Sequence, residues 1–301
     1  MSTTRPALGV DVGGTNVRAA LVSAGGEILR RVSQPVGGGR AGFVAMLAGM
    51  SRQLGCDEAS SIGVGLPGRV DARANAVISA GYLDIAGLPV AELLCEATGL
   101  PVFIENDCAM ALVAEMAVGA AAGQRDVVML TIGTGIGGAI AMDGRLLRGA
   151  AFAGQLGHVT VDIDGEVCRC GRRGCVETMS SGTALTRHLV QAGRSPGTTP
   201  RELLDAAAAG DAAAVALLRR WVRPLRSAID SLIAAVDPAI VLLGGGLGGA
   251  AYESLAYAPS ASSWYQRPVR PAALGDDAGM IGAALRAQHI LDGTMQAESA
   301  R

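Results

Sequence analysis

The sequence of 301 residues is poor in aromatic side chains, has no block of basic residues and has no long uninterrupted apolar run. Aromatic residues make up 3% of the chain and apolar residues 50%, so the core must be built from Ala, Val, Leu and Ile. A formal net charge of −2 argues against a surface that binds nucleic acid. No apolar run approaches the roughly 18 residues of a membrane span, and residues 1–6 lack an apolar signal core. We therefore expect a cytoplasmic protein with no membrane partner.

Cysteine is also scarce. The chain has six cysteines in 301 residues, which does not indicate a disulfide scaffold. Cys56, Cys95 and Cys108 stand alone in apolar surroundings. This placement predicts three buried thiols in a reducing compartment.

The other three cysteines lie close together after a histidine, in the order His158, Cys168, Cys170 and Cys175. Thiolates and imidazole are the ligands that tetrahedral Zn²⁺ prefers, and four protein ligands leave no open position for water. The spacing His-x9-Cys-x-Cys-x4-Cys is compact, which favours a structural zinc site over three reduced thiols near an unrelated histidine. Such a site would pin a long loop that has no core of its own.

A unit of strand, glycine turn, strand, turn and strand is predicted twice, over residues 7–32 and residues 127–148. Gly13 of the first copy aligns with Gly133 of the second. Such an internal repeat indicates a duplicated architecture, in which two facing halves place their glycine turns on opposite sides of one cleft. The chain length likewise predicts two domains of roughly 100–200 residues each.

The domain boundary is predicted near residue 120, where glycines end a helix. This helix is expected over residues 108–118 and stops at Gly119, shortly before the second copy of the repeat. We therefore expect an N-terminal α/β domain at residues 1–119, joined by the C-terminal helix at about residues 286–301. The C-terminal α/β domain would span residues 120–285 and carry the zinc loop.

Three glycine turns each follow a predicted strand, where bare backbone N–H groups can approach phosphate oxygens. They comprise Gly13, Gly14 and Thr15 in the first turn, Gly133, Thr134 and Gly135 in the second, and Gly244, Gly245 and Gly246 in the third. Two turns in register and a third after another strand indicate a nucleotide cleft rather than three incidental turns. Neither of the first two has the lysine of a P-loop or the Rossmann spacing.

Asp107 is the candidate for the chemical step. It follows the strand predicted at residues 101–104, and an aspartate there can accept a proton from a substrate hydroxyl that attacks the γ-phosphoryl group. The alternative is that Asp107 is the N-cap of the helix at residues 108–118. Both roles can hold, since a cap fixes its carboxylate on a rigid element.

These motifs together resemble the ROK (repressor, open reading frame, kinase) sugar kinases. The resemblance rests on the segment Gly157-His158, the Cys-x-Cys-Gly-x-x-Gly-Cys knuckle before Glu177, and the triplet Glu105-Asn106-Asp107. It implies an α/β fold of the actin-like, hexokinase-like (ribonuclease H-like) class, which is a duplicated two-domain ATPase fold with a central cleft. It also implies ATP-dependent phosphorylation of a hydroxyl of a hexose or amino sugar, by a homodimer or a higher homo-oligomer.

The resemblance further implies how the nucleotide and the reacting hydroxyl are held. The first two glycine turns would bind the phosphates of ATP, and the third, with Gly245 and Gly246, would lie by the adenosine. Asp107 would be the general base and Asn106 would hydrogen-bond the sugar. Asp11 is similar to the family's acidic residue near Mg²⁺, although an ordinary polar residue at a strand end is the alternative.

The sugar pocket is where this chain departs from the family. By resemblance, Gly68 lies in a loop that approaches the sugar, His158 directs one ring nitrogen to the metal and the other to the sugar, and Glu177 accepts a sugar hydroxyl. Most ROK kinases carry glutamate where this chain has Gln155, and the family's Asn and Trp are missing from residues 79–84. These departures leave phosphoryl transfer intact and predict a modified or differently configured sugar, unless Gln155 simply accepts one hydroxyl.

Two other functions are weighed against the kinase. A sugar-responsive repressor of the same family needs a helix-turn-helix domain ahead of the first strand, and only about six residues precede it here. A non-catalytic protein that binds or senses sugar is the second alternative. The presence of Asp107 and all three glycine turns argues against it, whereas Gln155 keeps it open.

Overall fold

The structure is a computed structural model that describes residues 5–81, 83–264 and 266–299, without the side chains of residues 294–299. Its contacts divide the chain into two units. Unit 1 comprises Met1–Ala122, Arg148–Phe152 and Asp276–Arg301, and unit 2 comprises Gly123–Leu147 and Ala153–Gly275. The chain thus returns to unit 1 about ten residues earlier than the expected position 286, because the last helix begins at Ala278 and already packs on the first strand at Met280 and Ala284.

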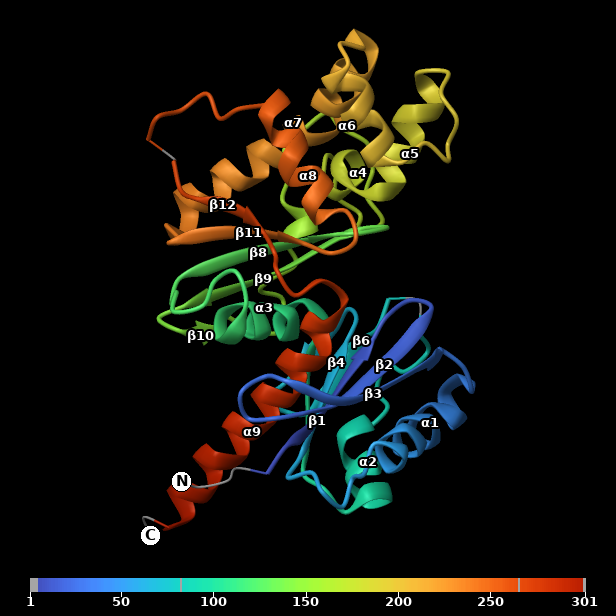
Figure 1. Cartoon of the computed structure of the whole chain (residues 1–301), viewed down its shortest axis with the longest axis vertical. Helices are drawn as coiled ribbons and strands as arrows, with labels where there is room; N and C mark the ends of the chain where they lie inside the picture. Colours follow the sequence, from blue (N-terminus) through green and yellow to red (C-terminus); the bar gives the residue numbers. More distant parts are fainter. Residues whose placement is uncertain (1–4, 82, 265, 300–301) are drawn as a thin grey trace. The chain divides into compact units, whose positions relative to one another are not determined.

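Unit 1 is built on a five-stranded sheet with the order β3-β2-β1-β4-β7 (Figure 1). The strands are β1 (Ala7–Val12), β2 (Asn16–Val22), β3 (Ile28–Pro35), β4 (Ile62–Leu66) and β7 (Val102–Asn106). The first three are antiparallel, and β1, β4 and β7 run parallel. A small hairpin, β5 (Arg69–Asp71) and β6 (Ala76–Ser79), lies outside this sheet.

The helices of unit 1 are α1 (Gly39–Gln53), α2 (Val90–Thr98), α3 (Asp107–Val118) and α9 (Ala278–Ser299). Alternate residues of β1 point to opposite faces, so Leu8 and Val10 share a core with α1 and α2, whereas Ala7 packs with Met280 of α9. Gly9 lies on the α9 side, where a Cβ atom would come within 1.8 Å of the Met280 carbonyl oxygen. The last helix therefore lies directly against the backbone of the first strand.

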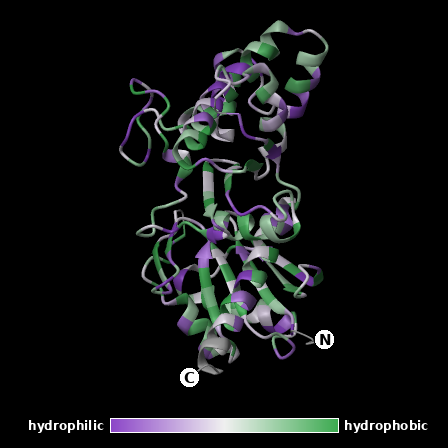
Figure 2. Cartoon of the chain, turned by 90° about the vertical axis from the view of Figure 1, so that its left-hand side faces the viewer, coloured by the Kyte–Doolittle hydropathy of each residue, from purple (hydrophilic) through white to green (hydrophobic). Residues whose placement is uncertain are grey.

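Unit 2 repeats the same sheet plan with the order β10-β9-β8-β11-β12. The strands are β8 (Val127–Ile132), β9 (Ile136–Met142), β10 (Arg145–Leu146), β11 (Ile240–Gly244) and β12 (Val269–Pro271). Again the first three in the chain are antiparallel and the later two join in parallel. The duplicated architecture expected from the glycine turns is therefore present, and the central strands of both sheets are strongly hydrophobic (Figure 2).

The helices of unit 2 gather around α7 (Ala212–Val236), whose Trp221 is fully buried. The other helical segments are η1 (Leu156–His158), α4 (Glu177–Ser180), α5 (Gly182–Gln191), α6 (Pro200–Ala208), α8 (Gly248–Ser254) and η2 (Leu255–Tyr257), and a short turn η3 (Gly275–Asp277) precedes α9. They enclose an aliphatic core around Trp221, in keeping with the scarcity of aromatic residues.

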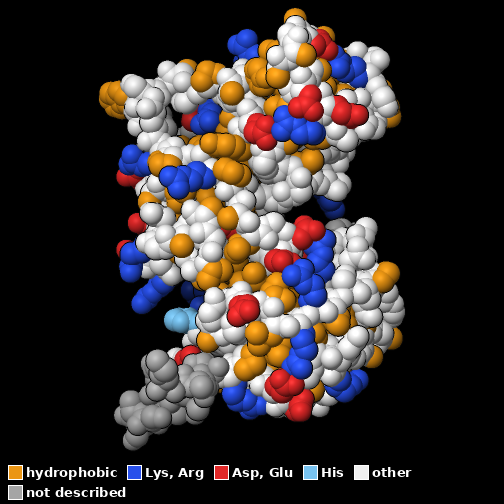
Figure 3. Space-filling view, in the orientation of Figure 1, with side chains coloured by type: hydrophobic (Ala, Val, Ile, Leu, Met, Phe, Trp, Pro, Cys, Tyr) orange, Lys and Arg blue, Asp and Glu red, His pale blue; other side chains and the backbone are white. Residues whose placement is uncertain are grey.

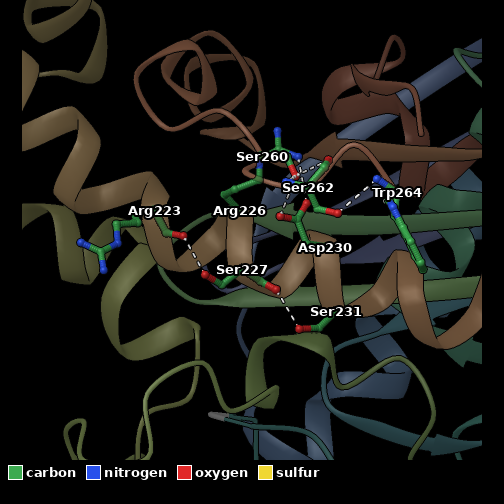
Figure 4. Close-up of polar contacts among 8 residues, drawn as sticks. All are labelled: Arg223, Arg226, Ser227, Asp230, Ser231, Ser260, Ser262 and Trp264. Carbon is green, nitrogen blue, oxygen red and sulfur yellow. Dashed lines mark hydrogen bonds and ion pairs between the residues drawn. The ribbon is translucent and has the colours of Figure 1, made fainter. Parts of the chain in front are cut away.

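Helix α7 continues through Pro224, although proline removes one backbone donor inside a helix. Beyond the proline, Ser227 donates to the Arg223 carbonyl at 3.3 Å and Arg226 pairs with Asp230 at 3.4 Å (Figure 4). Ser260 of the following loop also donates to Asp230, at 3.0 Å. These contacts and the buried apolar face of the helix outweigh the missing bond.

Charged side chains on the face in Figure 3 form small groups of both signs.

The three isolated cysteines are not all buried, contrary to the prediction from the sequence. Cys95 is exposed and Cys56 and Cys108 are half-buried, so the prediction of three buried thiols is wrong. Cys95 lies on the outer side of α2, whose buried side contains Ala91 and Leu94. Among the described residues, no helix combines the length and the apolarity that crossing a membrane requires.

Candidate active site

The strand-to-helix junction of unit 1 holds Asn106 and Asp107. Strand β7 ends at Asn106, which has extended backbone angles, and its side-chain oxygen accepts the N–H of Ala109 at 3.1 Å. Asn106 is therefore the N-cap of α3, and the assignment of that role to Asp107 is wrong. Asp107 already has helical geometry as the first residue of α3. Its carboxylate is consequently not required to cap the helix.

The Asp107 carboxylate is held by two donors. Its Oδ1 accepts the backbone N–H of Cys108 at 2.8 Å and the Asn106 Nδ2 at 2.9 Å. Burial raises the pKa of Asp107 above its usual value of 3.8, and the hydrogen bonds from Cys108 and Asn106 oppose this rise only in part. A fixed carboxylate with a raised pKa is suited to accept a proton.

Asn106 also connects this junction to the loop that contains Gly68. Its Nδ2 donates to the Gly68 carbonyl at 3.0 Å. Gly68 has a φ of +88°, and a Cβ atom there would lie 2.4 Å from the carbonyl oxygen of Ser79. Only glycine fits this turn without a shift of the backbone. Unit 1 therefore brings together three residues that the sequence assigned to the site: Gly68, Asn106 and Asp107.

Glu105, just before the junction, forms an ion pair that the sequence did not indicate. Its side chain is 6% exposed, and its Oε2 accepts two N–H groups of Arg148, at 2.8 Å from Nε and 2.7 Å from Nη2. Its Oε1 accepts the backbone N–H of Asn106 at 3.1 Å. The pair thus braces the strand end that carries Asn106 and Asp107.

Asp11 at the end of β1 is a second acid near Asp107. Burial and the negative charge of Asp107 raise the pKa of Asp11 to about 7, and Arg18, at 3.8 Å, opposes this rise. Two neighbouring carboxylates with this tendency to bind protons suit a divalent cation, whose charge would replace the proton. The turn with Gly13, Gly14 and Thr15 follows directly, and Gly14 and Thr15 are exposed.

In unit 2 the second and third glycine turns lie side by side. The Gly133 carbonyl accepts the N–H of Gly182 at 2.8 Å, and the Thr134 carbonyl accepts the Thr183 hydroxyl at 2.8 Å, so the turn rests on the start of α5. The N–H of Leu247, just after Gly245 and Gly246, donates to the Ile132 carbonyl at 2.9 Å. Gly245 and Gly246 are exposed and follow β11, which pairs with β8, the strand that precedes the second turn. The two turns therefore stand at the ends of neighbouring strands.

Glu177 is tied to the second glycine turn. Its Oε2 accepts the N–H of Ile136 at 2.8 Å. A Cβ atom on Gly135 would lie 2.4 Å from this same oxygen. One carboxylate oxygen of Glu177 thus supports the turn, a role that the sequence did not reveal.

His158, Cys168, Cys170 and Cys175 form one cluster in unit 2. Their candidate ligand atoms all lie within 4.8 Å of one another, with 3.5 Å between His158 Nδ1 and Cys168 Sγ and 3.6 Å between the sulfurs of Cys170 and Cys175. A tetrahedral zinc ion has Zn–S distances of about 2.3 Å and Zn–N distances of about 2.0 Å, which such separations can accommodate. The donor set is therefore compatible with zinc. Gln155 is half-buried at the start of η1, the turn that carries His158.

Two α/β units on the same five-stranded plan, with glycine turns after matching strands, define an actin-like, hexokinase-like ATPase fold. The chain belongs to the ROK family, whose family model matches residues 7–290. It is 34% identical to a glucokinase of Thermotoga maritima, with 92% of this chain and 95% of that protein covered. It is 32% identical to an N-acetylmannosamine kinase of Citrobacter koseri, with 93% and 98% covered.

A solved structure shares this fold. A ROK family glucokinase from Streptomyces griseus, in complex with glucose and AMPPNP, superposes with a TM-score of 0.78 at 30% identity, covering 94% of this chain and 99% of that one. The predicted family and the predicted fold class are thereby confirmed.

Proposed function

We propose that this chain is an ATP-dependent carbohydrate kinase that transfers the γ-phosphoryl group of ATP to a hydroxyl of a hexose or amino sugar, with Asp107 as the general base. The enzyme class follows from the glucokinase and N-acetylmannosamine kinase that resemble the chain over more than nine-tenths of its length. The observation that carries the role of Asp107 is its fixed, buried carboxylate with a raised pKa, beside Asp11.

The proposed step moves one proton and one phosphoryl group. As the sugar oxygen forms its bond to the γ-phosphorus, the bond from that phosphorus to the β-phosphate oxygen breaks and ADP leaves. Asp107 takes the hydroxyl proton, while Asn106 orients the sugar and Asp11 helps to hold Mg²⁺. The magnesium ion supplies charge neutralisation on the phosphates.

The glycine turns are assigned to the nucleotide. The backbone N–H groups of the exposed residues Gly14 and Thr15, and those of the turn at Gly133, Thr134 and Gly135, would bind the phosphates. Gly245 and Gly246, next to the second turn, would lie by the adenosine. AMPPNP in the Streptomyces griseus glucokinase supports a nucleotide site of this kind.

The cluster of His158, Cys168, Cys170 and Cys175 would hold one structural Zn²⁺, which supplies a fixed anchor for the loop and no chemistry of its own. With Nδ1 directed to the metal, the other ring nitrogen of His158 is left for the sugar. Gln155 and the second oxygen of Glu177 are assigned to sugar hydroxyls, and the Gly68 loop borders the same sugar. We also propose a cytoplasmic homodimer or higher homo-oligomer, which light scattering of the purified protein would test.

A coupled assay of ADP release with a panel of hexoses and amino sugars tests the function. We expect turnover that depends on both the sugar and Mg²⁺. Sugar binding without any ADP release would instead support the alternative of a non-catalytic sensor. The relatives do not favour that alternative, because the two named above are kinases.

A further inference from the structure

A cavity of about 890 Å³ lies within unit 2, and none of the residues that line it has been assigned to the sugar, the nucleotide or the zinc ion. One wall is a face of α7 between Ala212 and Ser227. Another is formed by residues of the segment 161–166, which lies between His158 and Cys168 in the chain, and α4 and α5 supply the rest of the lining.

Three arginines of α7 share the face that lines this cavity: Arg219, Arg220 and Arg223. Arg223 lies four positions after Arg219 and three after Arg220, so the side chains are neighbours on the helix surface. All three residues are exposed. Like charges at such spacings repel one another, and the cluster therefore opposes the stability of α7 unless an anion offsets it.

The contacts of these arginines provide no such anion. Among the described residues, no hydrogen bond or ion pair reaches the guanidinium of Arg219 or Arg223, and Ser227 bonds only the backbone carbonyl of Arg223 (Figure 4). Arg220 donates to the side-chain oxygen of Gln191 at 2.8 Å, and this amide is uncharged. The three positive charges are thus not neutralised by direct contact.

The other walls add a fourth arginine and two acids. Arg187 of α5 pairs with Glu166 at 2.8 Å and also donates to the Thr178 carbonyl. Asp162, the second acid, is exposed and accepts the backbone N–H of Asp164 at 3.1 Å. One acid is therefore already paired with Arg187, and the other stands against the three arginines of α7.

The remaining titratable group of the lining, His188, is buried and adds no charge. Burial lowers the pKa of His188 below its usual value of 6.5, and the charges of Arg220 and Arg187 lower it further, although the Met179 carbonyl opposes this. The imidazole is therefore neutral at pH 7. Four arginines and two acids then give the lining a formal charge of +2.

The geometry points to a binding site for a phosphate group in this cavity, with Arg219, Arg220 and Arg223 as its donors. A phosphate dianion carries the charge that offsets the lining, and its three terminal oxygens can accept from several guanidinium groups. A carboxylate has one charge and two oxygens, so it matches the lining less well. The site goes beyond the proposed kinase reaction, in which none of these arginines has a role.

Free phosphate and the phosphate group of a small organic ester share the chemistry that the arginines recognise. An ester would gain more from the cavity, because apolar side chains such as Val161 and Val215 also line it. The affinities of the two ligands therefore distinguish these sources.

Isothermal titration calorimetry of the full chain tests the site, with inorganic phosphate and glycerol 3-phosphate as separate probes. Titrations in about 0.15 M NaCl screen diffuse attraction to exposed charges. We expect saturable binding of at least one probe, with a Kd of roughly 1 mM or below. Tighter binding of glycerol 3-phosphate assigns an organic ester, and equal affinities assign free phosphate.

The double variant Arg219→Gln with Arg223→Gln should weaken this binding by roughly ten- to a hundredfold, because it removes two charged donors. Glutamine is a good helix former, so α7 should persist, and without phosphate the melting temperature should be no lower than that of the wild type. If the double variant does not fold, Arg223→Gln alone replaces it and should weaken binding by about threefold or more.

Arg125→Gln with Arg145→Gln is the matched control. Both arginines are exposed in unit 2 and lie outside the lining of the cavity, and the control removes the same net charge. It should change the Kd by no more than about twofold, because distant exposed charges are screened. Phosphate should likewise raise the melting temperature of the wild type and the control more than that of the cavity variant.

The absence of saturable binding of either probe below about 10 mM overturns the site. Binding that the cavity variant leaves unchanged, or that the control weakens equally, overturns it as well. Phosphate held only by the glycine turns of the proposed nucleotide site would give such an unchanged result.

Discussion

Arg148 holds the buried carboxylate of Glu105 through two N–H groups that converge on a single oxygen. The other oxygen of Glu105 accepts the backbone N–H of Asn106, so the arginine acts on the junction of Asn106 and Asp107 through one intermediate residue. Arg148 is therefore a positioning residue for the proposed general base, and it acts through an ion pair whose carboxylate is almost wholly removed from water.

Arg148→Met should lower the free energy of unfolding by roughly 3 kcal/mol, because it leaves the Glu105 carboxylate buried without its partner. The double variant, which combines Glu105→Met with Arg148→Met, should recover much of that loss, because it leaves no unpaired charge. Urea denaturation of the three proteins measures both values. A double variant no more stable than Arg148→Met would show that the pair does not act as a unit.

Asp107→Asn should lower kcat by a hundredfold or more, because the amide keeps an acceptor for Cys108 and Asn106 but cannot take the hydroxyl proton. KM for the sugar and the melting temperature should change little, since the cap of α3 is Asn106. Steady-state kinetics and thermal unfolding of the same preparation check both. A variant with most of its activity and normal folding would refute Asp107 as general base.

The stability of unit 1 should depend on the protonation of Asp11. Its pKa rises from 3.8 to about 7 on folding, so the folded chain binds a proton that the unfolded chain releases. Stability is therefore lost as the pH rises through the window from about 4 to about 7, by no more than about 4 kcal/mol. Denaturation curves in EDTA should show this slope in the wild type and a weaker slope in Asp11→Asn. Added Mg²⁺ should reduce the loss at high pH, and equal slopes in both proteins would contradict the assignment.

Cys170→Ser should release the bound metal and weaken sugar binding, because His158 would lose the anchor that orients its second nitrogen. Elemental analysis of the wild type should find one zinc per chain. Cys95→Ser is the control, since Cys95 is exposed and distant in sequence from the cluster. Wild-type protein that contains no zinc or other tightly bound metal would rule out the site.

Gln155→Glu should improve kcat/KM for glucose about three- to thirtyfold, because a charged hydrogen bond is worth roughly 1.5–3 kcal/mol against about 1 for a neutral one. The wild type should use plain glucose weakly. Efficient use of glucose by the wild type, without any gain from the glutamate, would mean that Gln155 simply accepts one hydroxyl and does not set the specificity.

Local sequence predicted those parts of the fold and of the candidate site that depend on neighbouring residues. The glycine turns, the duplicated strand units and the Asn106-Asp107 junction fall in this class, since turns and strand ends have their own sequence signatures. Which of two adjacent residues caps α3 was not predictable, because Asn and Asp cap almost equally well and backbone angles decide between them.

The contacts that the sequence did not reveal join distant segments. Arg148 lies 43 positions from Glu105, and Phe152 stacks on Arg69 from a still more remote segment. Neither arginine stands in a recognisable spacing, because an ion pair or a stacked ring leaves no periodic signal in the chain. Only the fold of unit 1 brings these side chains together.

The contact between Gly9 of the first strand and Met280 of the last helix makes unit 1 depend on a segment that is translated after all of unit 2. Strand β1 precedes unit 2 in the chain, but the helix that covers one face of β1 follows it. A chain that ends at Gly275 therefore contains all of unit 2 and leaves one face of the unit 1 sheet uncovered. The purified truncated chain should show protease resistance in unit 2 and cleavage in unit 1.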